Sequence, residues 1–306
     1  MPTPPIPWLE RLDRLRVDRD EEKGRAPHKP LLLLAVLDLW EAGGLRDGWV
    51  ELGPELILRF QNFWPIVAER RRNRGDIRMP FHALGTDGVW AVFDREGRPS
   101  QARDTSVCAQ VNGELLQCLA DPGFREQARQ RLITRYFPPA EQVALNAALG
   151  FEADAKHILA EKPQEFRRAR DTGRSARFKN LVVGGYRFTC ALTGYRLVTS
   201  NQAGIVEAAH IHALSDSRNN DPRNGLALTP TAHALFDLGL WSVGDDLRIL
   251  VQPAAAFEET PDGGFSLRAL AGRPLQFVAG AGLRPGREHL AWHRRQHGFS
   301  SVAVSG

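Results

Sequence analysis

The chain has 306 residues, of which 42% are hydrophobic and 25% charged, so it can bury substantial cores and is long enough for two domains. No apolar run approaches the ~20 residues of a membrane helix and the first residues lack a secretory signal pattern, so we expect a protein without membrane contact. Three cysteines are too few for a disulfide framework and suit the cytoplasm, while a net charge of +4, carried largely by arginine, favours an anionic partner.

In chain order, the N-terminal region begins with helices. Apolar residues at helical spacing predict a short helix near residues 8–15. The apolar run 31–40 predicts a buried helix that begins after Pro27. Residues 47–52, "DGWVEL", predict a strand after it.

The next elements complete a first domain. Residues 54–72 predict a helix that is interrupted or kinked near Pro65. We interpret residues 77–93 as two short strands about a turn at "GTDG". Residues 112–137 predict a helix broken at "DPG", which places the end of the domain near residue 138.

The second half of the chain predicts a connector followed by a region of strands and loops. We expect residues 139–175 to form a connector with at least one helix, followed by a flexible or DNA-facing basic segment. From about residue 178 the pattern indicates strands and loops before a C-terminal helix. The sequence therefore predicts an α+β protein with domains at 1–138 and 176–306 and a linker between them.

Four polar residues near the C-terminal strands suit hydrolytic chemistry: His210, Asn224, His233 and Asp237. Histidine titrates near neutrality and can act as a base. His233 and Asp237 stand at i and i+4 on one helix face, so both can reach one divalent ion. "VEAAH" predicts a strand that holds His210, and the amide of Asn224 can pin the polar loop. A base and a cation are what phosphodiester hydrolysis requires.

The motifs "AAHI", "NGLAL" and "HALFD-G" occur in this order within residues 190–243. They resemble the HNH endonuclease family, whose core is two strands and a helix around one metal ion. The resemblance implies that His210 is the general base, that Asn224 orients the loop, and that His233 and Asp237 bind Mg²⁺ or Mn²⁺.

Two positions depart from the family pattern. The residue before the base is Ala209, where relatives often carry a metal ligand, so either Asp237, Glu207 or water completes the ion's coordination or the metal site is weak. "CALT" has Cys190 but Thr193, and no second cysteine pair follows. Because four thiolates cannot be assembled, we expect no structural zinc.

Arginine clusters at residues 69–78, 166–179 and 293–297 favour nucleic acid as the partner. In the first domain, "APHKPLLLLAVLDLW" and "MPFHALGTDGVWAV" resemble the sulfur-binding domain of McrA-like type IV restriction enzymes, over about residues 10–110. That resemblance implies recognition of phosphorothioated DNA.

A sulfur atom is larger, softer and a poorer hydrogen-bond acceptor than the oxygen it replaces. An apolar cup rimmed by cationic donors could therefore select it, and "MPFHA" supplies residues for such a cup. The predicted contacts to DNA and sulfur are His28, Lys29, Arg74, Met79, Pro80, Phe81, His82 and Ala83.

These features together predict a restriction endonuclease that cuts phosphorothioated double-stranded DNA, with a homodimer to make the two nicks. One alternative is an HNH nuclease directed to methylated or hydroxymethylated cytosine, although base readers usually use an aromatic cage and the aromatic residues here have apolar, core-like surroundings. The other alternative is a catalytically dead HNH domain that only binds modified DNA.

Overall fold

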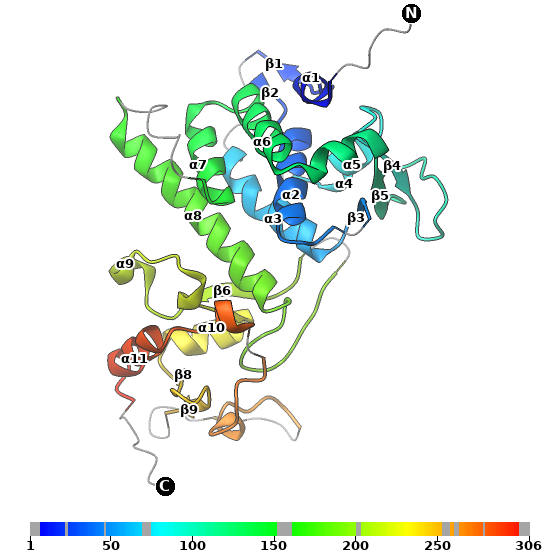
Figure 1. The fold of residues 1–306 in the computed structure, drawn as a ribbon. Helices are drawn as coiled ribbons and strands as arrows, with labels where there is room; N and C mark the ends of the chain where they lie inside the picture. The colour runs from blue at the N-terminus through cyan, green and yellow to red at the C-terminus, as the bar shows by residue number, and fades with distance from the viewer. Residues whose placement is uncertain are drawn as a thin grey trace, which may run out of the picture. The chain divides into compact units, whose positions relative to one another are not determined.

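The computed structural model describes residues 7–21, 24–45, 47–68, 75–151, 161–199, 203–252, 258–259, 263–277 and 279–299 (Figure 1). The fold is α+β, as predicted. Contacts divide the chain into a first unit, residues 1–177 with 199–203, and a second unit, 178–198 with 204–306. The domain boundaries at residues 138 and 176 stay a prediction. None of the helices in the described ranges combines the length and apolar character that a membrane span requires.

The first unit is built around one buried helix, α2 (His28–Glu41), as its apolar run predicts. α2 contacts α3, α4 and α6, and a three-stranded antiparallel sheet has the order β3-β5-β4. The other elements are α1 (Trp8–Asp13), β1 (Arg19–Asp20), β2 (Gly24–Arg25), β3 (Trp49–Glu51), α3 (Pro54–Val67), α4 (Arg78–Ala83), β4 (Trp90–Phe93), β5 (Cys108–Val111), α5 (Gly113–Ala120) and α6 (Pro122–Tyr136).

One segment of the first unit differs from its predicted structure. Of the two strands expected within residues 77–93, only β4 forms, and the first is the helix α4. Ile77, Phe81 and Leu84 are all buried, which is the spacing of a helix face rather than of a strand. Pro80 stands in the first turn, where the backbone N–H that proline lacks has no helical partner to lose.

The predicted connector contains two helices, α7 (Pro139–Leu149) and α8 (Pro163–Gly185). α7 is buried along most of its length and contacts α3 and α6. α8 continues through the basic stretch and on to Gly185, so the strand pattern expected from residue 178 is wrong there. Val182 and Val183 are buried on the helix, and this packing overrides the preference of β-branched residues for strands.

The second unit holds two small antiparallel sheets, β6-β7 and β8-β9. α10 contacts both β7 and β8, and α11 packs on β8. The elements are β6 (Glu207–His210), α9 (Leu214–Ser217), η2 (Pro222–Asn224), β7 (Gly225–Leu228), α10 (Pro230–Asp237), β8 (Trp241–Val243), β9 (Ile249–Val251), η3 (Arg268–Leu270), η4 (Ala281–Leu283) and α11 (Arg287–Gln296).

Candidate active site of the second unit

His210 ends strand β6, where it pairs with Gly225 of β7. Gly225 leaves room for the end of α8 to pack directly on the hairpin, because a Cβ there would lie 2.5 Å from Cγ2 of Val182 and 2.9 Å from Cζ of Phe178. Phe178 stacks on the His210 ring, with ring centroids 3.9 Å apart and an interplanar angle of 7°. The motif glycine therefore lets an aromatic ring hold the imidazole in place.

Asn220 contacts the other edge of the imidazole. His210 Nε2 lies 3.0 Å from Asn220 Oδ1, and an amide oxygen only accepts, so Nε2 carries the proton and Nδ1 keeps its lone pair. Burial lowers the pKa of His210 below its ordinary value of 6.5, the Asn220 hydrogen bond raises it, and the His233 and Lys179 charges lower it further. The imidazole is therefore neutral at neutral pH, which is the form that can accept a proton.

Asn224 pins the polar loop, as expected from its position in the sequence. Its side chain is fully buried. Oδ1 accepts from the backbone N–H of His212 at 2.8 Å, while Nδ2 donates to the carbonyls of His212 at 2.9 Å and Asn219 at 3.1 Å. Three bonds from one amide fix the loop that carries Asn220, and through it the orientation of the His210 imidazole.

The helix α10 presents His233 beside two carboxylates. His233 Nδ1 lies 2.9 Å from Glu207 Oε1, and Nε2 lies 3.4 Å from Asp237 Oδ2. Cys190, which is fully buried, accepts the backbone N–H of Thr229 at 3.5 Å, directly before α10. This thiol thus contributes to anchoring the start of the helix.

The glycine of "HALFD-G" also has a steric reason. Gly239 has φ 67, a backbone conformation that L side chains rarely adopt. A Cβ at this position would collide with the His297 ring. Gly239 therefore ends α10 with a tight turn that allows the last turn of α11 to pack beside it.

One cleft of about 440 Å³ brings the predicted residues together. It is lined by His210, His233 and Asp237, with Trp292 and Gln296 from α11 among its other walls. Asn224 lies behind this surface and acts through the backbone. The structure thus assembles His210, His233 and Asp237 in one place from β6 and α10.

The donor set fits a divalent ion held partly by substrate and water. The described residues contain no group of three or more His, Cys, Asp or Glu side chains arranged to hold a metal ion. His233 Nε2 and Asp237 Oδ2 are 3.4 Å apart, close to the ~3 Å that separates neighbouring ligands in an octahedral shell with bonds of about 2.1 Å. Glu207 on Nδ1 is the kind of partner that fixes a ligand histidine's tautomer. Mg²⁺ typically uses few protein ligands plus waters and phosphates.

His293 of α11 is a structural histidine. It is 2% exposed and stacks on Phe236, with ring centroids 3.7 Å apart. Nδ1 lies 2.9 Å from Ser242 Oγ, and Nε2 lies 3.1 Å from the Phe236 carbonyl. Burial is the main reason that its pKa falls to about 4. The neutral ring therefore serves as a polar link between α11, β8 and α10.

The residues predicted to bind sulfur occupy varied positions in the first unit. His28 stacks obliquely on Trp64, with centroids 4.9 Å apart, and Lys29 Nζ lies 2.6 Å from Asp87 Oδ2. Both begin α2, which contacts α4. The N-terminus of α2 and the predicted cup thus lie in one region of the unit.

Within α4 the predicted cup residues differ in exposure. Met79 is 43% exposed, whereas Phe81 is 0% exposed and packs on Trp90. Pro80 is buried and Ala83 partly buried. His82 is also partly buried, and its Nδ1 lies 2.8 Å from Ser106 Oγ. Phe81 therefore shapes the segment from within. Arg74 lies outside the described residues.

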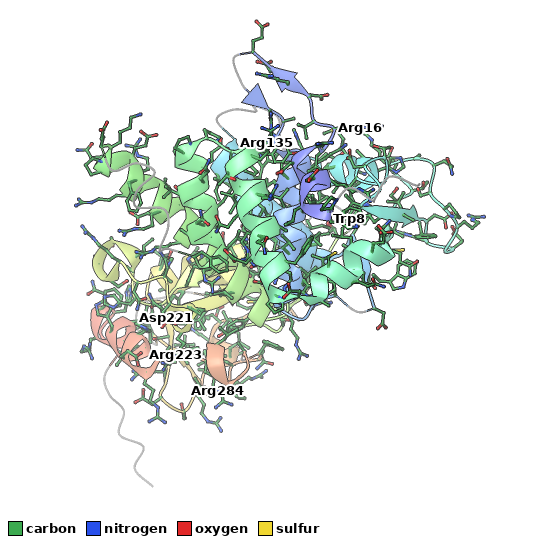
Figure 2. The ribbon with its side chains drawn as sticks, turned by 45° about the horizontal axis from the view of Figure 1, so that its top comes forward. Trp8, Arg16, Arg135, Asp221, Arg223 and Arg284 are labelled. Carbon is green, nitrogen blue, oxygen red and sulfur yellow. The ribbon has the colours of Figure 1, made fainter. Side chains whose placement is uncertain are left out.

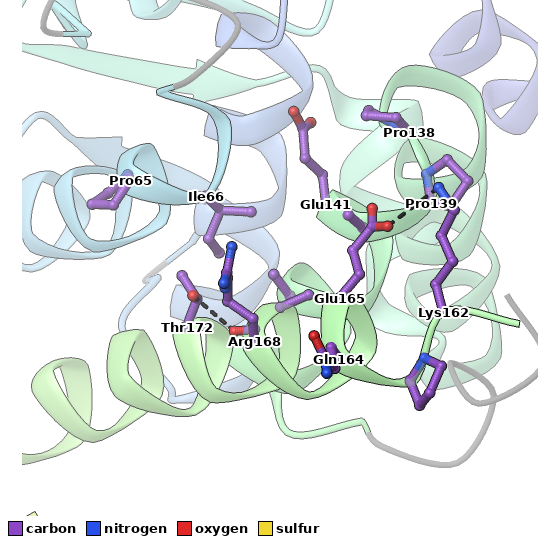
Figure 3. Close-up of a pocket in the computed structure, with 14 residues that line it drawn as sticks. Pro65, Ile66, Pro138, Pro139, Glu141, Lys162, Gln164, Glu165, Arg168 and Thr172 are labelled. Atoms are coloured by element: carbon purple, nitrogen blue, oxygen red, sulfur yellow. Dashed lines mark hydrogen bonds and ion pairs between the residues drawn. The ribbon is translucent and has the colours of Figure 1, made fainter. Parts of the chain in front are cut away.

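A larger groove in the first unit lacks the histidines that line the cleft of the second unit (Figure 3). It measures about 1010 Å³ and is lined by the end of α3, the start of α7 and α8. Its charged side chains include Lys162 and Glu165, which form an ion pair at 3.3 Å. No histidine or cysteine lines it. Among the pockets of the described residues, the cleft of His210 is therefore the better candidate for catalysis.

Sequence reasoning missed two residues of the site, Asn220 and Phe178. Asn220 was visible only as part of a polar turn, although its place in the loop pinned by Asn224 could have marked it. Phe178 gave no signal, because it lies far from the motif in sequence and was assigned to the edge of a strand region.

Comparison with known proteins agrees with both halves of this description. A family described as "ScoMcrA-like, DNA sulfur-binding domain" matches residues 7–154, and a family described as "HNH endonuclease" matches residues 190–244. A solved structure titled "Modification dependent TagI restriction endonuclease" is similar at 22% identity with a TM-score of 0.31, covering 40% of this chain and 37% of that one. The chain thus spans little more than a third of that protein. Comparison with curated proteins gives no match. In this order along the chain, residues 7–154 thus match a DNA sulfur-binding domain and residues 190–244 an HNH endonuclease domain.

Proposed function

We propose that the protein is an endonuclease directed by its first domain to phosphorothioated double-stranded DNA, which its HNH domain hydrolyses with Mg²⁺ or Mn²⁺. The observation that carries this proposal is the shared cleft of His210, His233 and Asp237. The family match to a DNA sulfur-binding domain supports the choice of substrate.

The chain's own residues perform three tasks in this reaction. His210, neutral and with Nε2 held by Asn220, accepts a proton from the attacking water at Nδ1. His233 and Asp237 would hold the divalent ion, and Glu207 orients His233. When bound, the ion supplies positive charge that offsets charge developing on the phosphate. Asn224 keeps the loop, and hence Asn220, in register with the base.

For the first domain we propose that the N-terminus of α2 and the exposed part of α4 contact the modified phosphate. His28 and Lys29 supply hydrogen-bond donors near the positive helix terminus. Met79, with Ala83, offers soft apolar surface. Because Asp87 already neutralises Lys29, the site is less electropositive than the sequence suggests, which suits selection for sulfur over bare charge.

A cleavage assay tests the catalytic proposal. The full chain with Mn²⁺ is incubated with a duplex carrying one phosphorothioate and with its all-oxygen twin, beside the His210→Ala variant. We expect wild type to cut the sulfur duplex faster than its twin, and His210→Ala to cut neither. No cutting by wild type would favour a domain that only binds DNA.

DNA binding by the His210→Ala chain distinguishes recognition of phosphorothioate from recognition of methylated cytosine. Gel shifts with matched phosphorothioate, methylcytosine and unmodified duplexes should show the tightest complex with phosphorothioate. Preference for the methylated duplex would replace sulfur with base modification as the signal.

We also propose that two copies act together, because cutting both strands of a duplex requires two nicks. Light scattering of the protein with and without DNA tests this, and a strict monomer in both conditions would refute it. The three cysteines are all unpaired, which fits our expectation that the reaction takes place in the cytoplasm.

A further inference from the structure

Three arginines line a second pocket of the HNH unit, separate from the cleft of His210. Arg223 belongs to η2, Arg284 follows η4, and Arg287 begins α11. Figure 2 labels the first two. They line one open pocket of about 520 Å³, together with Gly282, Pro285 and Glu288. No motif of the sequence analysis includes these arginines.

Their guanidinium groups are available to a ligand. All three residues are exposed, and within the described part of the chain none has a side-chain hydrogen bond or a carboxylate at ion-pair distance. Arg294 of the same unit, by contrast, pairs with Asp245 at 2.7 Å. The guanidinium groups here thus lack the internal partner that a purely structural arginine has.

Two carboxylates near the pocket are already engaged. Glu288 lines the pocket, and its Oε1 lies 3.7 Å from His289 Nε2. Asp221 accepts the backbone N–H of Arg223 at 2.8 Å. Three guanidinium groups against one lining carboxylate leave the pocket positively charged, and such a pocket attracts an anion.

The pocket is fixed relative to the catalytic cleft. Arg223 directly precedes Asn224, and its carbonyl accepts the backbone N–H of Gly286 at 2.8 Å, just before α11. Near its middle, α11 carries Trp292, which lines the cleft and stacks on His212 with ring centroids 4.0 Å apart. Arg287 and Trp292 are separated by about 7.5 Å along the helix axis, so one short helix joins the pocket to the cleft.

We propose that Arg223, Arg284 and Arg287 bind backbone phosphates of duplex DNA beside the bond that is cut, and so hold the strand across the cleft. The inference rests on the proposed function, since it takes DNA as the substrate. Arginine forks match phosphate oxygens. Contacts of this kind position the duplex without reading its sequence, which leaves selection of the target to the first domain.

The test compares three full-length variants on unmodified duplex in EDTA. Arg284→Gln/Arg287→Gln removes two charges, Arg284→Lys/Arg287→Lys keeps them, and Arg248→Gln is the control. Arg248 lies in the same unit, but its guanidinium already donates to the Gly272 carbonyl at 2.7 Å and pairs with Asp246 at 3.5 Å. Affinity is measured over a range of salt concentrations, and melting curves confirm that each variant is folded.

We expect the double glutamine variant to bind about tenfold more weakly and to lose roughly one unit of the slope of log affinity against log salt for each phosphate contact removed. The lysine variant should keep most of that slope, and Arg248→Gln should match wild type. A folded double glutamine variant with the affinity and salt slope of wild type would overturn the proposal.

A small substrate separates this outcome from failure of the proposed function. Bis(p-nitrophenyl) phosphate with Mn²⁺ reports on the cleft without a duplex to hold, so the arginine variants should hydrolyse it at the wild-type rate. Loss of that hydrolysis in the double glutamine variant would mean that the arginines support the cleft itself and would overturn a role limited to DNA. If wild type cleaves neither substrate, the endonuclease proposal fails, while the binding measurements still decide the arginine pocket.

Discussion

His210 and Phe178 stack face to face, with ring centroids 3.9 Å apart and planes 7° from parallel, although they lie on a strand and on a distant helix. Phe178 is buried, so its ring is a fixed wall. Because Asn220 holds the edge of the same imidazole, the ring of the proposed base is constrained on a face and on an edge. Such preorganisation is what a positioned general base requires.

Phe178→Leu should lower kcat for DNA cleavage about tenfold, equivalent to ~1.4 kcal/mol of activation free energy. Leucine keeps the site apolar but cannot stack, so the imidazole gains freedom to turn. KM should change little, since Phe178 has almost no exposed surface. Phe60→Leu is the matched control, because Phe60 is a fully buried phenylalanine of α3 that belongs to the first unit. Equal loss of kcat in both variants would point to general destabilisation instead.

Asn220 should control the pH dependence of cleavage. Its hydrogen bond raises the pKa of His210 while burial lowers it, so removing the bond lowers the pKa further. Asn220→Ala should move the acidic limb of the pH–rate profile to lower pH and reduce kcat about tenfold, because the tautomer is no longer fixed. Asn220→Asp should move the limb to higher pH, since a carboxylate stabilises the protonated ring.

The neighbouring residue gives a control for this profile. Asn219 Oδ1 accepts the backbone N–H of Asp221 at 2.8 Å, so Asn219→Ala perturbs the same loop without removing a bond to the imidazole. Its acidic limb should stay at the wild-type position. The proposed role is refuted if Asn220→Ala and Asn220→Asp move the limb in the same direction.

Asn224→Asp should destabilise the fold by about 3 kcal/mol, because an ionised carboxylate cannot donate to the two carbonyls that Nδ2 now satisfies. Asn112→Asp is the matched comparison for Asn224→Asp. Asn112 caps α5 using only its oxygen, which accepts from Glu114 and Leu115, so aspartate should serve equally well there. Urea unfolding of both variants measures the difference, and similar costs would contradict the hydrogen-bond argument.

Asp237→Asn should raise the Mn²⁺ concentration for half-maximal cleavage at least tenfold, because an ionised ligand is replaced by a neutral amide. Glu207→Gln should have a smaller effect, since the amide oxygen can still accept from His233 Nδ1. Calorimetric titration of Mn²⁺ into each protein checks the affinities without relying on turnover. Unchanged affinity in Asp237→Asn would remove Asp237 from the ion's coordination.

His293 should make the stability of the fold depend on pH. Its pKa is about 4 in the folded protein and ordinarily 6.5. Between these values the unfolded chain binds more protons than the folded protein. The contribution of His293 to the free energy of unfolding is therefore fully present above pH 6.5 and falls by up to about 3 kcal/mol as the pH drops toward 4. His293→Gln should be less stable at neutral pH but should show a shallower decline over this window. Melting temperatures measured from pH 4 to 7 test this, and parallel curves would assign the decline to other groups.

The sequence predicted local structure correctly wherever a single pattern dominated a segment. The apolar run of α2 has no competing interpretation, because a segment of that length without turn residues buries itself as a helix. The order of His210, Asn224 and His233 was visible because the motif is compact in sequence. The i and i+4 relation of His233 and Asp237 follows from helix geometry alone, and the structure places both in one cleft with His210.

Elsewhere local preference was misleading. "MPF" reads as strand by composition, but Phe81 and Leu84 are buried together only on a helix. The valines at the end of α8 favour strands locally, yet both are buried on a helix, and Val182 packs against Gly225. In both places contacts between segments distant in sequence outweigh propensities of a few tenths of a kcal/mol per residue.

By itself, then, the sequence determined which residues can carry the proposed chemistry, since residue type and spacing single out two histidines, a carboxylate and the loop amide. Only the tertiary structure decided how that chemistry is held: the ring of Phe178 over the base, Asn220 at its edge, and three arginines from η2, the segment after η4 and α11 gathered around one pocket. These contacts join segments far apart along the chain. Their geometry follows from packing, which no local pattern records.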